Sequence, residues 1–192
     1  MTVGPDVLAR NVALLQTSPQ AGDLLTLVWE DVNQGSVPTP VNFQDRVVVR
    51  QRNADGSPGA VILNTAVAFA GDAALPLSVG EVRTRSFSFT LPNGLLGTGT
   101  FDVSVTADSN AAGAGIIFET SVAGDAETNN SAAASFASSA RVYADLSVTE
   151  LIVPALIESG GDAVVTWTVS NAGTVPAPGS WVARIILTQD AI

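Results

Sequence analysis

The sequence contains no histidine and no cysteine, and its eight basic residues are all arginine, so lysine is missing as well. These absences remove the imidazole base, the thiol nucleophile, the amine that forms Schiff bases and the usual ligands of zinc. The remaining reactive groups are carboxylates, hydroxyls, one tyrosine and the arginines. The composition therefore predicts a protein that is not an enzyme and that holds no cofactor.

Positive charge is also scarce, because the formal net charge is −10 at pH 7. A nucleic-acid surface needs clustered positive charge, and anionic lipid headgroups repel an acidic protein. No apolar run reaches the ~18–20 residues of a membrane-spanning helix. We therefore expect no nucleic-acid partner and no membrane insertion.

Apolar residues, by contrast, are plentiful: 46% of the residues are hydrophobic and only 14% are charged. This balance is typical of a chain with a buried core rather than of a disordered one. Residues 1–5 form a short N-terminal extension, which lacks both the basic and the apolar region of a secretion signal. We expect the chain to be an excised piece of a longer secreted protein, and the alternative is a naturally short chain.

A long stretch of the sequence occurs twice. Asp6 to Arg50 returns as Asp145 to Thr188 about 139 residues later, a period that has the size of an independently folded domain. The matched residues of the first copy are Gly22, Asp23, Trp29, Asn33, Gly35, Val37, Pro38, Pro40 and Arg46, and those of the second are Gly161, Asp162, Trp167, Asn171, Gly173, Val175, Pro176, Pro178 and Arg184. The sequence predicts a complete domain over 6–144 and the first third of a second domain over 145–192, with almost no linker between them.

Alternation of apolar and polar residues with a period of two runs through both copies, for example over 86–91, 101–107 and 163–170. This pattern indicates strands with one face in a core, and clusters of Gly, Asn and Pro mark the turns between them. The candidate strands of the first copy are 6–16, 24–33, 42–51, 60–69, 82–91, 99–108, 115–122 and 136–143. The candidate strands of the second copy are 146–153, 163–171 and 181–188. Antiparallel strands of this length predict an all-β fold, a two-sheet β-sandwich.

The shared parity of the strands predicts which side chains form the core of the first copy. They are Trp29, Phe87, Phe89, Phe101, Val103 and Val105. The alanine-rich stretch 131–140 also fits a helix, because alanine is the best helix former. We prefer a strand that enters at Phe136, because serine weakens a helix and a last strand must lead the chain to Asp145.

The second strand of the first copy contains one extra residue, because the offset between the copies falls by one between Asp23 and Trp29. A β-bulge requires such an extra residue. By alignment, Asp31 takes the place of Val169. The preferred interpretation is that a bulge returns Val32 to the core and leaves Asp31 exposed; the alternative is a carboxylate at a core-facing position.

Several motifs recur in a fixed order and spacing across nearly the whole chain. In the second copy they are Asp145-Leu146-Ser147-Val148, Gly161-Asp162, Val165 to Thr174 and Ser180 to Thr188. The first copy repeats them more loosely and adds Gly80-Glu81, Leu91-Pro92, Gly99-Thr100-Phe101 and Glu127-Thr128-Asn129-Asn130. Together they resemble a known family, the cell-adhesion-related domain of bacteria called CARDB.

The resemblance implies an Ig-like sandwich that serves as a repeated module of large bacterial, and some archaeal, surface or secreted proteins. It implies no chemistry. The sequence departs from the family pattern at two places. Phe43 stands where the second copy has Trp181, and the region 107–131 is longer and richer in glycine and alanine than expected.

Three pairs of repeated residues could bind a ligand, but each has a simpler structural interpretation. Trp29 and Trp167 could stack on sugars, yet a Trp in an alternating strand is more often a core residue. The Asn-X-Gly motifs at 33–35 and 171–173 could bind a ligand, but Asn and Gly tolerate positive φ and so form turns. Arg46 and Arg184 could bind an anion, although a salt bridge or a solvated strand face is preferred.

Acidic and amide side chains gather in the region 108–130 and are weak candidates for a calcium site. They are Asp108, Asn110, Glu119, Asp125, Glu127 and Asn129, with Asn130 beside them. Calcium needs ~6–8 such oxygens, but no EF-hand spacing is present. Two of these carboxylates could also be imagined as a glycosidase pair, although acids on sandwich loops commonly meet without catalysis.

The sequence therefore favours a non-catalytic structural or adhesion module of a cell-surface or secreted repeat protein. Two alternatives stay open, a carbohydrate- or protein-binding module and a subunit that forms filaments when its partial domain accepts strands from another chain. The expected partners are neighbouring repeats or copies of itself, and a surface glycan or protein under the second alternative. The apolar face of the incomplete second copy needs a cover, which the first copy, a donated strand or a neighbouring molecule could supply. We expect a homo-oligomer or filament at high concentration, and the alternative is a frayed segment at an artificial cut.

Overall fold

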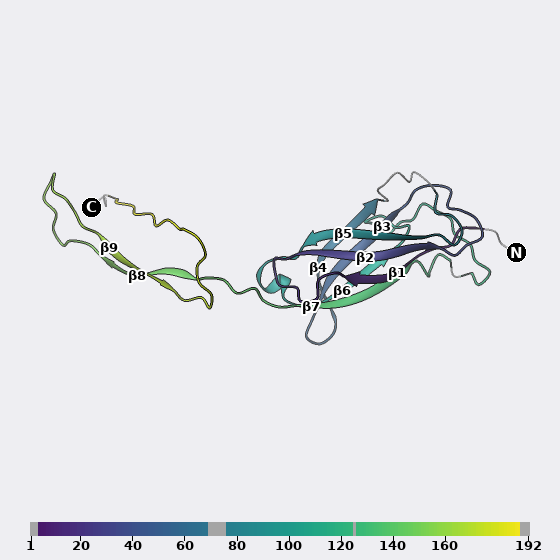
Figure 1. Ribbon diagram of the computed structural model, residues 1–192, viewed down its shortest axis with the longest axis horizontal. Coiled ribbons are helices and arrows are strands. Elements are labelled where there is room, and N and C mark those ends of the chain that lie inside the picture. Colours follow the sequence, from purple (N-terminus) through teal and green to yellow (C-terminus); the bar gives the residue numbers. More distant parts are fainter. Residues whose placement is uncertain (1–3, 69–75, 125, 189–192) are drawn as a thin grey trace. The chain divides into compact units, whose positions relative to one another are not determined.

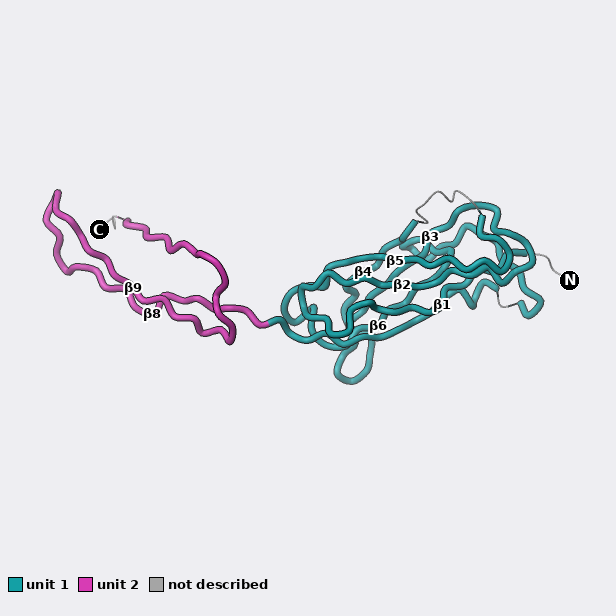
Figure 2. Tube along the Cα trace, in the orientation of Figure 1, with its two compact units in different colours: residues 1–141 teal, residues 142–192 magenta. Residues whose placement is uncertain are grey.

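The computed structural model describes residues 4–68, 76–124 and 126–188. The chain divides into two compact units, residues 1–141 and 142–192 (Figure 2). Apart from one 3-10 turn, η1 (Gly94–Gly97), the regular elements of the described ranges are all strands.

No helix in the described part of the chain is long and apolar enough to cross a membrane.

The first unit is a sandwich of two antiparallel sheets (Figure 1). One sheet has the order β1-β2-β5, formed by β1 (Val7–Leu14), β2 (Leu24–Asn33) and β5 (Val82–Thr90). The other has the order β4-β3-β6-β7, formed by β4 (Pro58–Ala68), β3 (Gln44–Arg52), β6 (Gly99–Thr106) and β7 (Ser131–Ser138). This arrangement confirms the predicted all-β antiparallel sandwich.

The core lies between the inner faces of the two sheets, where the period-two pattern places the large apolar side chains. Trp29, Phe89, Phe101, Val103 and Val105 are buried there, as predicted. The ring of Phe101 stacks on that of Phe136, with 5.1 Å between the ring centroids. Phe87 is only half-buried and packs against the edge of this core.

Two predicted strand positions at the end of the first unit are wrong. Residues 115–122 form no strand, because the carboxylate of Asp108 accepts the backbone N–H groups of Ile116 and Ile117 that a ladder would use. The last strand begins at Ser131 rather than at Phe136. It pairs with β6 along its full length, so sheet pairing overrides the helix propensity of the alanines.

The preferred interpretation of the second strand is also wrong. β2 pairs with β5 without any register shift from Leu24 to Val32, and the bulge lies instead on β1 between Arg10 and Ala13. Asp31 is fully buried rather than exposed. The alternative, a carboxylate at a core-facing position, is therefore correct.

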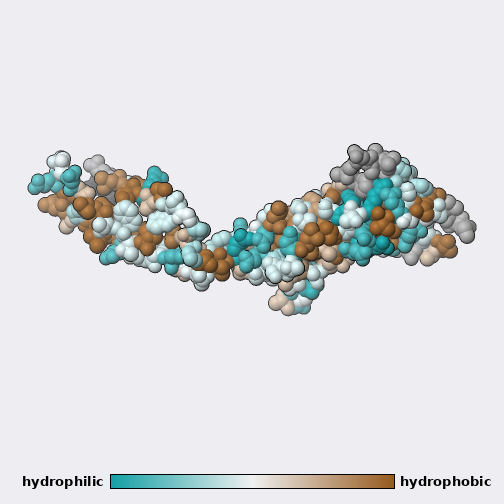
Figure 3. Space-filling model, in the orientation of Figure 1, coloured by the Kyte–Doolittle hydropathy of each residue, from teal (hydrophilic) through white to brown (hydrophobic). Residues whose placement is uncertain are grey.

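The second unit contains one antiparallel pair, β8 (Leu146–Ile152) and β9 (Thr166–Asn171). The prediction of a third strand over 181–188 is wrong, because these residues form no strand in the described structure. Without a second sheet, 38% of the Trp167 surface stays exposed, so this side chain does not occupy the predicted core position. Apolar side chains on the surface of this unit are visible in Figure 3.

Candidate functional site

Three charged side chains lie inside the first sandwich beside Trp29. Asp31 follows Trp29 on the core-facing side of β2, Asp45 precedes Val47 on that of β3, and Arg85 precedes Phe87 on that of β5. Each charge therefore continues the inward parity of its own strand. We call Trp29, Asp31, Asp45 and Arg85 the inter-sheet cluster, because Asp45 belongs to the opposite sheet from the other three.

Arg85 is the centre of this cluster. Its Nη1 lies 2.7 Å from Asp31 Oδ2 and 3.0 Å from Asp45 Oδ2. Its Nη2 donates to the carbonyl oxygens of Val67 and Ala68 at 3.0 and 3.1 Å. The guanidinium also lies 5.6 Å from the centre of the Trp29 ring, within reach of a cation–π contact.

The indole of Trp29 joins the same two carboxylates. Its Nε1–H lies 2.9 Å from Asp45 Oδ2 and 3.1 Å from Asp31 Oδ1. Asp45 Oδ1 is buried and has no hydrogen-bond partner. Burial raises the pKa of Asp31, against the opposing effect of Arg85, and raises that of Asp45 well above its usual range, with the Asp31 carboxylate adding to the rise.

The inter-sheet cluster joins the two sheets and offers no route to a substrate. Asp31 and Asp45 are both fully buried, and Arg85 is buried as well. A general acid or base must come within hydrogen-bond reach of the group that it protonates. The role of the two carboxylates is therefore structural: both bond the buried guanidinium of Arg85, and this links β3 to β2 and β5.

We expect the free energy of unfolding to fall as the pH rises above about 4, and the substitution Asp45→Asn to make that fall less steep. The folded-state pKa values of Asp31 and Asp45 lie above the ordinary value of 3.8. The folded protein thus retains protons that the unfolded chain has released, and this contribution to stability is lost as the pH rises through the raised values.

Urea unfolding of the wild type and of Asp45→Asn from about pH 4.5 to about pH 8.5 measures the two slopes. The amide oxygen introduced by this substitution can still accept hydrogen bonds from Trp29 and Arg85, so the geometry is preserved. Glu119, whose pKa is also raised, adds a slope of the same sign to both proteins. Equal slopes would show that Asp45 is ionised throughout this range.

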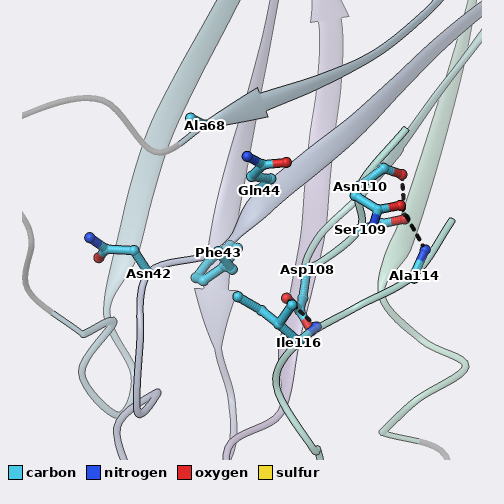
Figure 4. Close-up of a pocket in the computed structure, with 9 residues that line it drawn as sticks. All are labelled: Asn42, Phe43, Gln44, Ala68, Asp108, Ser109, Asn110, Ala114 and Ile116. Atoms are coloured by element: carbon cyan, nitrogen blue, oxygen red, sulfur yellow. Dashed lines mark hydrogen bonds between the residues drawn. The ribbon is translucent and has the colours of Figure 1, made fainter. Parts of the chain in front are cut away.

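The sequence-predicted acidic residues lie on the connection between β6 and β7, at the end of the sandwich where the chain enters β1 (Figure 1). Asp108 accepts from Ile116 and Ile117 at 2.9 and 2.8 Å, and Asn110 Oδ1 accepts from the backbone of Ala112 and Ala114. Both side chains therefore hold this connection in shape. They line a pocket of about 450 Å³ together with Phe43 (Figure 4).

The other predicted residues form a second group, which we call the acidic pole: Glu119, Glu127, Asn129 and Asn130, with Asp6 beside them. Glu119 N–H donates to Glu127 Oε1 at 2.8 Å, and Asn129 Nδ2 donates to Asp6 Oδ1 at 3.0 Å. Burial, together with the nearby carboxylates of Glu127, Asp108 and Asp6, raises the pKa of Glu119 to about 8, against the opposing effect of a hydrogen bond from the Val7 backbone.

Asp125, the sixth calcium candidate, lies outside the described residues. Within the described ranges, no three acidic side chains come together as a metal site on their own. Any cation at the acidic pole must therefore combine carboxylates with amide or backbone oxygens.

A third feature occurs in both units and is built on the repeated Asn-X-Gly motif. In the first unit, Asn33 Oδ1 accepts from Asp6 N–H at 3.2 Å and from Gly35 N–H at 3.0 Å, while Nδ2 donates to the Val37 carbonyl at 2.8 Å. Gln34 N–H also donates to the Asp6 carbonyl at 2.9 Å. The side chain of Asn33 thus ties the incoming chain to the end of β2.

The second unit repeats these bonds. Asn171 Oδ1 accepts from Asp145 N–H at 2.9 Å and from Gly173 N–H at 3.0 Å, while Nδ2 donates to the Val175 carbonyl at 2.8 Å. Ala172 N–H donates to the Asp145 carbonyl at 2.7 Å. We call this arrangement the asparagine clasp.

The clasp explains the glycine of the motif differently from the sequence-based expectation. Neither Gly35 nor Gly173 has a positive φ. A Cβ at either position would instead fall within 2.6 Å of the backbone nitrogen of Asp6 or of Asp145. Glycine is therefore needed for close approach of two backbones rather than for a turn.

Sequence reasoning missed Arg85 and the clasp partners Asp6 and Asp145. The parity of β5 contained a signal for Arg85, because it lies two residues before Phe87. Arg46, which the sequence analysis weighed as an anion site, donates from Nε to Asn64 Oδ1 at 2.9 Å on an exposed strand face.

Among solved structures, this chain is similar to a CARDB domain from Pyrococcus furiosus, which was solved in complex with di-metal ions. The two share 16% identity over 73% of this chain and 99% of that domain, with a TM-score of 0.47. This chain is similar to CARDB domains. A solution structure of the same CARDB domain has a TM-score of 0.45, again at 16% identity, over 73% of this chain and all of that domain.

The likeness to CARDB domains concerns the fold, as does a likeness to an unrelated enzyme. An alkylpurine DNA glycosylase from Pseudomonas fluorescens, bound to DNA with an abasic site analog, is 12% identical with a TM-score of 0.45. That match covers 70% of this chain but 31% of the glycosylase. No protein-family model and no curated protein matches the chain.

Proposed function

We propose that this chain is a non-catalytic structural or adhesion module, a complete repeat and part of the next in the tandem array of a bacterial or archaeal cell-surface or secreted protein. Its partners are neighbouring repeats. The observation that carries the proposal is the duplicated asparagine clasp, in which the incoming chain is fixed in the same way in both units. A bond pattern repeated at the start of each repeat serves to join repeats.

The composition and the charged groups support the non-catalytic part of the proposal. The chain has no His, Cys or Lys, and the fully buried carboxylates of Asp31 and Asp45 share Arg85. Asp108 accepts two backbone N–H groups within its own loop. These carboxylates have structural roles that account for their positions.

We expect the substitution Asn171→Ala to speed hydrogen exchange at the amides of Asp145 and Gly173 by roughly 10-fold or more, because each amide loses its acceptor. Exchange measured by NMR on the full chain gives both rates. The matched substitution Asn33→Ala should act on Asp6 and Gly35 and leave the second unit unchanged. If Asp145 already exchanges at the rate of an unstructured peptide in the wild type, the incoming chain is not held and the proposal fails.

The exposed apolar side chains of the second unit favour a second candidate function, assembly by strand addition between copies. Val148, Leu151 and Trp181 are 60, 62 and 52% exposed beside strand edges, and such edges are templates for pairing with another chain. Light scattering across a concentration series, on the full chain and on a chain without residues 146–192, tests it. A mass that does not change with concentration in both proteins removes this candidate.

A further inference from the structure

The acidic pole contains more hydrogen-bond acceptors than donors. The side-chain amide of Asn130 lies 3.3 Å from Glu119 Oε2, 2.9 Å from Asn129 Oδ1 and 2.5 Å from the Ala126 carbonyl oxygen. An amide group carries two N–H donors, so three acceptors compete for two protons. Glu119 is only 3% exposed, and its Oε1 has no partner at all.

The neighbouring side chains increase this excess. Asn129 donates its amide to Asp6, so its Oδ1 faces Asn130. Glu127 accepts one N–H at Oε1, from Glu119, and its other oxygen remains. The carboxylates of Glu127, Asp108 and Asp6 lie near enough to Glu119 to add to the rise of its pKa that burial causes. Buried acceptors without donors are costly, and a cation removes this cost for several of them together.

We propose that the acidic pole binds one calcium ion between Glu119 and Glu127, with the oxygens of Asn129, Asn130 and the Ala126 carbonyl completing its coordination. Calcium takes ~6–8 oxygen ligands, with mixed carboxylate, amide and carbonyl donors. A cation needs oxygen ligands, so it requires the Asn130 amide orientation in which the side-chain oxygen faces Glu119 Oε2, Asn129 Oδ1 and the Ala126 carbonyl oxygen. A cavity of about 130 Å³, lined by Glu127, Asn130 and Asp108, leaves space for bound water.

The proposed calcium site is linked to the asparagine clasp through Asp6. Asn129 bonds the Asp6 carboxylate, and the Asp6 backbone N–H is the group that Asn33 accepts. Gln34 Nε2 donates to the other oxygen of the same carboxylate at 3.1 Å. Calcium at Asn129 would therefore stiffen the segment that the clasp holds.

Thermal unfolding of the full chain, in excess EDTA and in millimolar calcium at constant ionic strength, tests the proposal. Saturating calcium should raise the midpoint by roughly 4–8 °C through binding to the folded state alone. Magnesium should raise it less, because it demands a near-ideal octahedron at shorter distances. Isothermal titration with calcium should give a single site.

Matched variants separate a specific site from general screening of the −10 net charge. Glu119→Gln and Glu127→Gln should each lose the calcium response, whereas Glu158→Gln, which removes one exposed charge from the second unit, should keep it. If Glu119→Gln does not fold, the exposed Glu127 provides the test. The proposal would be overturned if calcium did not raise the unfolding midpoint, or if it raised that of Glu127→Gln as much as that of the wild type. A proton on Glu119, rather than a calcium ion, would then neutralise its carboxylate.

Discussion

Replacing Arg85 by methionine should lower the free energy of unfolding by about 3–5 kcal/mol, because it leaves two buried carboxylates without their shared cation. Asp31 and Asp45 have no exposed surface, so water cannot replace the guanidinium. Two backbone carbonyls, of Val67 and Ala68, lose a donor in the same substitution. Urea unfolding at neutral pH measures the loss.

A control with the same chemical change is Arg52→Met. Arg52 pairs with Asp102 on the surface, where both side chains are about 40% exposed. Solvent and salt screen such a pair, so this substitution should leave stability nearly unchanged. A loss in Arg85→Met as small as that in Arg52→Met would show that Arg85 does not compensate the buried carboxylates.

Removing all three charged side chains of the inter-sheet cluster should cost much less stability than removing Arg85 alone. A buried ion pair often contributes no more than apolar residues of similar volume, because its desolvation offsets its attraction. The triple substitution Asp31→Leu, Asp45→Leu and Arg85→Met should therefore recover most of the stability that Arg85→Met loses. A triple variant as unstable as Arg85→Met would contradict this account and point to poor packing instead.

The parity of the strands could be predicted from the sequence, because alternation is a local property of each strand. Leu25, Leu27 and Trp29 mark the buried face of β2 without reference to any other strand. The burial of Asp31 could not be predicted in this way. It depends on Arg85, 54 residues further along the chain, and on Asp45 in the other sheet. The one-residue fall in the offset between the copies suggested a bulge in β2, but the register shift lies on β1.

The residue at which a strand begins or ends depends on which acceptor its backbone N–H groups bond. The local sequence pattern does not show this. Residues 115–122 contain enough apolar residues to suggest a strand, but their backbone N–H groups at 116 and 117 donate to the Asp108 carboxylate. β7 instead begins at Ser131, opposite Thr106 of β6. The candidate calcium residues also differ in whether their oxygens bond the loop backbone. Asp108 and Asn110 accept backbone N–H groups within the loop, whereas Glu119 keeps a buried oxygen without a partner.

Replacing Phe101 by alanine should lower the free energy of unfolding by about 3–5 kcal/mol, through lost burial and the cavity that remains. Phe101 is fully buried near the start of β6, and its ring stacks on Phe136. Both sheets contact this region, so the surrounding side chains can collapse only in part. Urea unfolding with an unchanged m-value would assign the loss to the folded state.

The matched substitution is Phe118→Ala, which removes the same atoms from a side chain that is 80% exposed. It leaves no cavity and should change stability little. The difference between the two variants therefore isolates burial from the intrinsic preferences of phenylalanine and alanine. A loss below about 1 kcal/mol in Phe101→Ala would mean that β6 turns its other face inward. In that case Asp102, Ser104 and Thr106 would face the core, and the strand parity on which the fold assignment depends would be wrong.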